Sequence, residues 1–148
     1  MIFPDLNYLA IFVAGLVPMA IGYLWYGVLF EKQWMESLNF TKKDVEGGNM
    51  AVIYGVSILF AMILAAAIKI DIEMTHKTVN DAGELIFGSF HTFQHGALHG
   101  LGIGFILGIP ALISNSLFQR NTGKNILLNV AYWLLTFAIM GGILDAWI

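Results

Sequence analysis

"LNYLAIFVAGLVPMAIGYLWYGVLF", residues 6–30, is a long apolar stretch without a single charged side chain. A helix needs about 20 apolar residues to cross the hydrocarbon core of a bilayer, so this stretch is long enough to span a membrane. Three further runs cover residues 50–68, 96–118 and 126–148, and they are interrupted by His99, Asp145 and a few small polar side chains. Because lipid offers no partner to unpaired backbone groups, each run must be helical. The sequence predicts an all-α integral membrane protein, a single-domain bundle of four transmembrane helices.

The overall composition supports a lipid environment. Of the 148 residues, 58% are hydrophobic and 11% are charged, whereas a soluble domain carries about 25% charged residues. The lipid bilayer is therefore the first expected partner. The net charge of −3 shows no basic excess, so no nucleic acid is expected as a partner. The absence of cysteine excludes disulfides, iron–sulfur clusters and thiolate zinc sites, which leaves histidine and carboxylate side chains as metal ligands.

The distribution of basic residues predicts the orientation in the membrane. With four spans, both ends of the chain share one side with the loop 69–95, and the loops 31–49 and 119–125 lie on the other side. The second side carries most of the basic residues, namely Lys32, Lys42, Lys43, Arg120 and Lys124, against Lys69 and Lys77 on the first side. Basic loops stay in the cytoplasm. We therefore expect a protein of the cytoplasmic membrane with its N- and C-termini outside.

Short interfacial helices are expected beside the spans. After the first span, Phe30, Trp34 and Leu38 recur every four residues with charged residues between them. This spacing is typical of an amphipathic helix lying at the membrane interface. Thr41 and Asp44 then have the spacing of a capping box, which predicts that a helix begins there.

The segment between the second and third spans is more polar. Asp81 and Glu84 also have the capping-box spacing, which predicts a helix from Asp81 into the third span. Such a helix exceeds a bilayer crossing, and we expect it to bend at Gly96 and Pro110. The charged residues that follow the second span are expected to form a solvated edge: Lys69, Asp71 and Glu73.

Three segments carry a resemblance to a known family. They are "GYLWYGVLFEKQWM" (22–35), "GALHGLGIGFILGIPALISNSLF" (96–118) and "NVAYWLLTFAIMGGILDAW" (129–147). Over essentially its whole length the chain resembles the bacterial "domain of unknown function 1761" family. The resemblance implies a small four-span membrane protein of bacterial type, and it supplies no catalytic residues. One departure is Glu31-Lys32, where the family pattern has a glycine after the Leu-Phe pair.

The third span carries a glycine series at helical spacing. Gly96, Gly100, Gly104 and Gly108 recur every four residues, and Asn115 continues the same face. Small residues at this spacing let two helix backbones approach closely in lipid. The face predicts either a homo-oligomer contact, with Asn115 donating a hydrogen bond across it, or packing inside a single four-helix bundle.

A histidine series precedes and overlaps the glycines. His91, His95 and His99 are four residues apart, and an adjacent pair such as His95 and His99 can share one metal ion. The start of the third span and the end of the fourth meet at the same membrane face, so Asp145 can add a carboxylate ligand. We therefore name His95, His99 and Asp145 as a candidate site for a divalent metal. The alternatives are structural hydrogen bonding between helices and a pH-sensing role.

Three functions remain open from the sequence. The leading hypothesis is a non-enzymatic homo-oligomer, joined through the glycine face, that binds or passes a small solute or ion. The second is a metal carrier or metalloenzyme that uses His95, His99 and Asp145, since ionisable residues inside a membrane are functional candidates by default. The third is a structural or accessory subunit without a ligand. No nucleophile triad, phosphate loop or dinucleotide fingerprint indicates catalysis or another cofactor.

Overall fold

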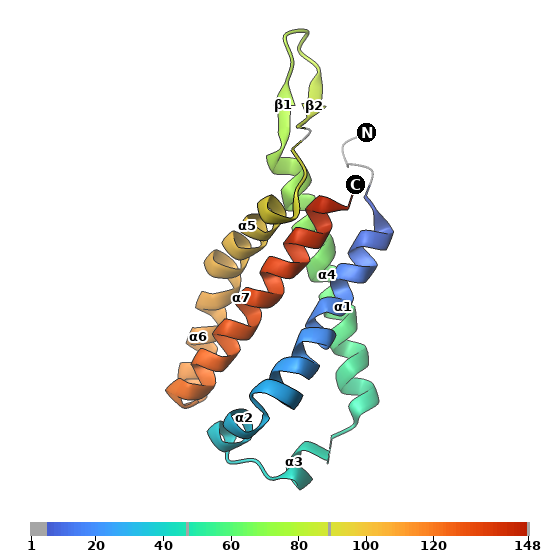
Figure 1. Ribbon diagram of the computed structural model, residues 1–148. Helices are drawn as coiled ribbons and strands as arrows, with labels where there is room; N and C mark the ends of the chain where they lie inside the picture. The colour runs from blue at the N-terminus through green and yellow to red at the C-terminus, as the bar shows by residue number, and fades with distance from the viewer. Residues whose placement is uncertain (1–5, 47, 89, 148) are drawn as a thin grey trace.

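The computed structural model describes residues 6–46, 48–88 and 90–147 (Figure 1). Within these residues, four helical segments are long and apolar enough to cross a membrane: Tyr8–Leu29, Met50–Thr75, Phe93–Phe118 and Gly123–Ala146. The predicted all-α class with four spans is therefore confirmed. The second span runs seven residues further than the uncharged sequence stretch, to Thr75 rather than Ile68. The individual elements of the spans are α1 (Tyr8–Gly22), η1 (Tyr23–Leu29), α4 (Met50–Thr75), α5 (Phe93–Ile103), η2 (Gly104–Gly108), α6 (Ile109–Phe118) and α7 (Gly123–Ala146).

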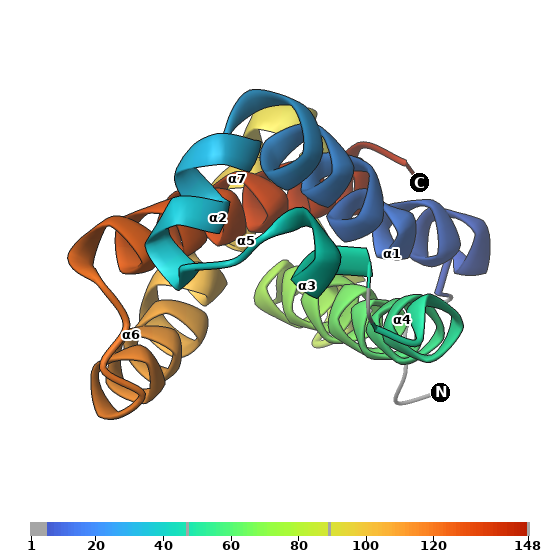
Figure 2. The same ribbon diagram turned by 90° about the horizontal axis from the view of Figure 1, so that it is seen from below.

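The helix α7 forms the centre of the bundle. It packs along α5 on one side and against α1 and α4 on the other, while α6 contacts its N-terminal part (Figure 2). The buried core is built largely from small and aliphatic side chains: Ala10, Ala14, Ala65, Ile68, Ile72, Met140 and Leu144. Many large apolar side chains, such as Phe60 and Phe105, remain exposed. This outward apolar surface suits a lipid solvent.

Two π-helical turns interrupt the spans. The turn η2 ends two residues before Pro110, and the amide of Ile109 donates to the carbonyl of Gly104. Proline has no amide hydrogen and its ring clashes with the preceding turn, so a local widening of the helix accommodates it. Gly96, where a bend was also predicted, lies inside the regular helix α5. The irregularity is therefore associated with Pro110 and not with Gly96.

Two short helices cover one end of the bundle. The predicted amphipathic helix is α2 (Glu31–Leu38), and it ends at Asn39, which adopts a left-handed conformation with φ of 56°. The helix α3 (Lys42–Glu46) follows. Its predicted capping residues contact each other, because the amide and the hydroxyl of Thr41 both donate to Asp44 Oδ2, at 2.7 and 2.6 Å.

The opposite end carries a β-hairpin where a helix was predicted from Asp81. The strands β1 (Lys77–Val79) and β2 (Leu85–Phe87) pair antiparallel. Asn80 closes the turn because its Oδ1 accepts from the amides of Ala82 and Glu84, and Gly83 adopts a φ of +78°. An Asn side chain that bonds its own turn, followed by a glycine with positive φ, favours a turn over a helix start. The helical prediction for this segment is wrong for that reason.

Candidate metal centre

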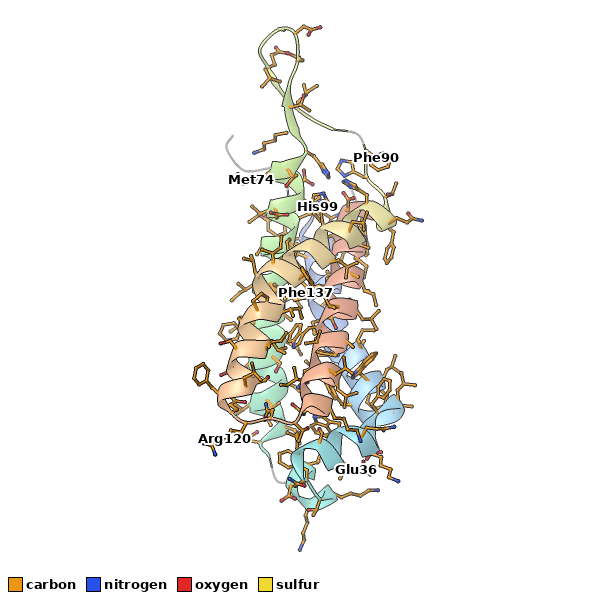
Figure 3. All side chains as sticks on the ribbon, turned by 90° about the vertical axis from the view of Figure 1, so that its left-hand side faces the viewer. Glu36, Met74, Phe90, His99, Arg120 and Phe137 are labelled. Carbon is orange, nitrogen blue, oxygen red and sulfur yellow. The ribbon has the colours of Figure 1, made fainter. Side chains whose placement is uncertain are left out.

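All four histidines of the chain gather at the end of the bundle that carries the hairpin. His99 lies at this end together with Met74 and Phe90, and Glu36 and Arg120 lie at the opposite end (Figure 3). The start of α1 and the end of α7 also meet here, since Asn7 Nδ2 donates to the carbonyl of Trp147 at 3.5 Å. The centre is therefore built from the end of α4, the start of α5 and the end of α7.

Local helix geometry positions three of the histidines. Thr92 caps α5, with its hydroxyl oxygen accepting from the amide of His95 at 3.2 Å. His95 and His99 are one turn apart on α5, and their ring centroids are 4.8 Å apart. His91 lies just before the helix. His76 comes from a different element, at the C-terminal cap of α4.

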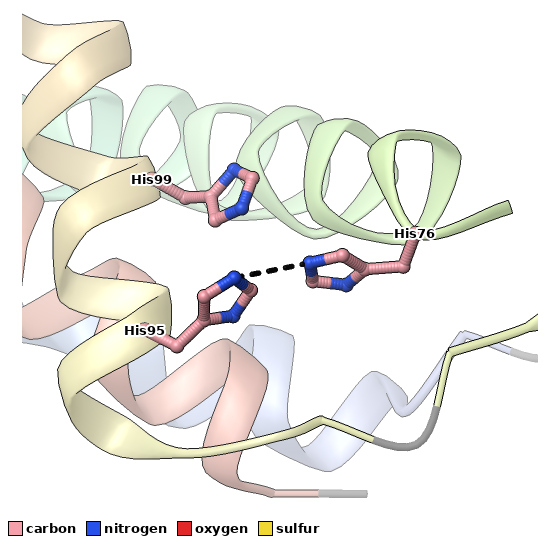
Figure 4. A group of neighbouring side chains, drawn as sticks. All are labelled: His76, His95 and His99. Carbon is pink, nitrogen blue, oxygen red and sulfur yellow. Dashed lines mark hydrogen bonds between the residues drawn. The ribbon is translucent and has the colours of Figure 1, made fainter.

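His76, His95 and His99 form a compact group of imidazoles (Figure 4). One ring nitrogen from each lies within 4.8 Å of the others, and the Nε2 atoms of His76 and His95 are 3.3 Å apart. Two nitrogens that share a tetrahedral Zn²⁺ at about 2.0–2.1 Å lie roughly 3.3–3.4 Å from each other. The spacing of the His76 and His95 Nε2 atoms therefore suits one shared metal ion.

Asp145 orients two of the imidazoles. Its side chain is fully buried in the last turn of α7, and Oδ1 and Oδ2 accept from Nδ1 of His91 and of His95 at 2.9 and 2.8 Å. A carboxylate that accepts from Nδ1 assigns the proton to that atom, which leaves the Nε2 lone pair of His95 facing His76. This carboxylate–histidine arrangement is the one that orients ligands around metals in proteins.

His76 is the last residue in the hydrogen-bonded series Asp145–His95–His76, and its Nδ1 atom takes no part in that series. Because His95 Nε2 accepts, His76 Nε2 carries the proton between them, and His76 Nδ1 is then a bare lone pair. Nδ1 is buried, and no described residue bonds to it. Burial and the neighbouring His95 lower the pKa of His76, so its ring is neutral at neutral pH. A neutral imidazole is the form that binds metals.

The structure brings together only part of the site named from the sequence. His95 contacts both other predicted residues, because it bonds Asp145 and stacks edge-on with His99. His99 instead approaches a residue of α4, with its Nδ1 lying 3.7 Å from Asp71 Oδ2. His76, which the sequence analysis did not include, takes the central position. Its only sequence signal is its place just after the second span, because 19 residues separate it from His95.

Lys69 and Glu73 lie on α4, two turns and one turn before His76. A solvated edge was predicted for this segment. Lys69 is 2% exposed, and its Nζ donates to the carbonyl of Leu144 at 2.9 Å and pairs with Glu73 Oε1 at 2.7 Å. A cation is favoured at the last carbonyls of a helix, here those of α7. The predicted solvated edge is therefore wrong for Lys69, although Asp71 is exposed. The bond to Leu144 fixes α4 beside the turn that holds Asp145.

The glycine face of the third span lies against α7 of the same chain. A Cβ atom added at Gly96 would meet the carbonyl of Gly141, and one added at Gly100 would meet the carbonyl of Phe137. Further along, a Cβ atom added at Gly104 or at Gly108 would lie 2.9 or 3.2 Å from the ring of Phe137. This close approach places the histidines of α5 beside Asp145. Asn115, the last residue of the predicted face, is exposed.

A second polar cluster, which the sequence analysis missed, lies at the α2 end of the bundle. Tyr26 donates to Asn129, Asn129 to Asn125, and Asn125 to the hydroxyl of Ser37, at 2.6, 2.9 and 3.1 Å. Ser37 in turn donates to the carbonyl of Trp34 at 2.7 Å. We call these residues the asparagine chain. It ties α2 to α7 and contains no carboxylate or imidazole.

Comparison with known proteins places the chain in a family. Residues 9–145 match the model of the family described as "Protein of unknown function (DUF1761)". No curated protein matches the chain, and no solved structure matches it. The match covers all four spans almost completely, so the chain belongs to this family.

Proposed function

We propose that this member of a family of unknown function binds a divalent transition-metal ion through His76, His95 and His99. The observation that carries the proposal is the group of three imidazole nitrogens within 4.8 Å of one another, gathered from two helices. Imidazole ligands suit Zn²⁺, Cu²⁺, Ni²⁺ and Fe²⁺. In the predicted orientation, with both termini outside, the ion lies at the outer face of the cytoplasmic membrane.

The protonation pattern around the site supports metal binding. Asp145 fixes the proton of His95 on Nδ1, so Nε2 is free to bind an ion. The proton that His76 Nε2 shares with His95 has an alternative position on His76 Nδ1, which has no partner among the described residues. An ion between the two Nε2 atoms can therefore replace the hydrogen bond.

Electrostatics also favours a cation here. Asp145 is fully buried, and its hydrogen-bond partners are two imidazoles. An ionised carboxylate away from water is costly unless a positive charge compensates it. Lys69, a buried lysine nearby, pairs with Glu73 instead. A divalent ion on His95 places positive charge one imidazole ring away from the carboxylate.

Three protein ligands leave a coordination position open. Structural zinc sites are filled by four protein ligands, whereas sites that exchange or activate a ligand keep one for water or substrate. The proposal is therefore a metal-handling membrane protein, in which the ion is carried or used, and not a bundle held together by metal. Homo-oligomerisation and passage of a solute remain predictions. The glycine face that motivated them faces α7 within the chain.

The test is the metal content of the full-length protein, purified without a tag in mild detergent. After incubation with Zn²⁺ and desalting, mass spectrometry should find about one ion per chain in the wild type. His76→Ala should lose it, and the control Gln119→Ala, at the other end of the bundle, should keep it. A wild-type protein without bound metal, folded as judged by circular dichroism, would reduce the centre to a hydrogen-bonded contact between helices.

A further inference from the structure

A second set of possible ligands overlaps the first. One atom from each of His76, His91 and Asp145 also lies within 4.8 Å of the others. The two sets share His76 and no other residue. The first set consists of three imidazole rings, and the second contains two rings and a carboxylate. Both combinations are established ligand sets for first-row divalent metals.

His76 occupies the middle of the centre. Its ring centroid is 4.6 Å from that of His95, 5.1 Å from His99 and 5.8 Å from His91. It follows the last turn of α4 and precedes the first residue of β1, so it sits at a junction between two elements. A ring at this place can contact an ion on either side without a change in the helices.

Asp145 has lone pairs left for a metal ion. A carboxylate offers about four acceptor positions, and the bonds from His91 and His95 use two of them. The carboxylate can therefore orient both imidazoles and still coordinate an ion beside His91. A carboxylate attracts a divalent ion more strongly than an imidazole does, and the burial of Asp145 strengthens this attraction.

The two sets differ in depth. The side chains of His95 and His99 are 25% and 18% exposed, whereas those of His91 and Asp145 are 11% and 0% exposed. The set of three rings is therefore nearer to water, and the set with the carboxylate is more enclosed. An ion that enters at the rings meets the carboxylate set next.

We infer that the centre has a second metal position, formed by His76, His91 and Asp145, which one ion occupies in exchange with the first. This inference rests on the proposed function. A neutral imidazole binds one metal ion at a time, so the shared His76 limits the centre to one ion. The site would then transfer a first-row divalent ion between an outer and an inner position instead of holding it permanently.

The experiment uses Co²⁺ as a probe on the full-length protein in detergent, because its visible spectrum depends on its ligands. Titrations compare the wild type, His91→Gln, His99→Gln, and the double variant His91→Gln/His99→Gln. Glutamine keeps hydrogen-bonding capacity, so circular dichroism should show all four folded. His76→Gln serves as the variant that lacks the shared ligand.

The inference predicts that His91→Gln and His99→Gln each still bind one Co²⁺, with two different spectra. Only the double variant and His76→Gln should lose binding, by at least tenfold. If His99→Gln binds as weakly as the double variant, the second position does not exist, although the first still does. Two ions bound to the wild type would contradict the exchange. No Co²⁺ on the wild type would refute the proposed function itself.

Discussion

The two ends of this bundle both bury polar side chains, but they do so in different ways. At the α2 end, each residue of the asparagine chain donates a hydrogen bond to the next, and the last bond goes to the carbonyl of Trp34. At the hairpin end, four imidazoles and a buried carboxylate meet, and His76 Nδ1 keeps a lone pair without a partner among the described residues.

The difference separates a structural polar cluster from a candidate site. Amide and hydroxyl groups that satisfy one another hold helices together in lipid and need nothing else. Titratable groups in a membrane are expensive, and a cluster of them indicates a function. The polar cluster at the α2 end therefore serves as a control for the cluster at the hairpin end. Changes at the α2 end should affect only stability, whereas changes at the hairpin end should also affect metal binding.

The largest effect is expected for Lys69→Met. The substitution removes the donor to Leu144 and leaves Glu73, whose side chain is 12% exposed, without its partner. Breaking a largely buried ion pair in this way costs about 3–5 kcal/mol. Thermal unfolding in detergent should show the loss. The double variant Lys69→Met/Glu73→Gln should recover much of it. If Lys69→Met were as stable as the wild type, the bond of Lys69 to Leu144 would not hold α4 to α7.

The next effect concerns the close approach of α5 and α7. Gly100→Ala drives a methyl group against the carbonyl of Phe137, and overpacking of this kind costs about 1–3 kcal/mol. Metal affinity should fall as well, because the histidines move away from Asp145. The control is Gly102→Ala, since nothing lies within 4 Å of a Cβ at Gly102. Equal unfolding temperatures for the two variants would contradict the packing of this face against α7.

Asp145→Asn tests the carboxylate with little change in shape. The amide weakens the orientation of His91 and His95, and loss of such a partner lowers metal affinity about 10–100-fold. Isothermal titration with Zn²⁺ measures the change. Unaltered affinity would mean that Asp145 has no part in the centre.

The smallest effect is expected at the asparagine chain. Asn125→Ala leaves Ser37 and Asn129 each short of one hydrogen bond, which costs about 1 kcal/mol. The unfolding temperature should drop slightly, with Zn²⁺ affinity unchanged. A loss of metal binding in this variant would abolish the distinction between the two ends.

The sequence predicts the helical class and the four spans because hydrophobicity and length alone determine what can cross a bilayer. It also predicts α2, since Phe30, Trp34 and Leu38 repeat at helical spacing. The hairpin was missed because Asn80 and Gly83 decide the turn more strongly than the spacing of Asp81 and Glu84.

The site was predictable only in part. The spacing of His95 and His99 along one helix is visible in the sequence, but contacts between helices are not. His76 meets them only because α4 extends to Thr75 and ends beside α5. The position of Lys69 after an apolar run likewise predicts an exposed side chain. Lys69 is buried because it bonds to Leu144 near the end of α7, and this contact between helices is not visible in the sequence.

The most direct test of the metal centre is X-ray absorption at the zinc edge, on full-length protein loaded with one equivalent of Zn²⁺. The account predicts a first shell of nitrogen and oxygen atoms at about 2.0–2.1 Å with the outer-shell scattering of imidazole rings, which disappears in His76→Ala. A zinc shell of oxygen atoms without imidazole scattering, or an unchanged spectrum in His76→Ala, would contradict it.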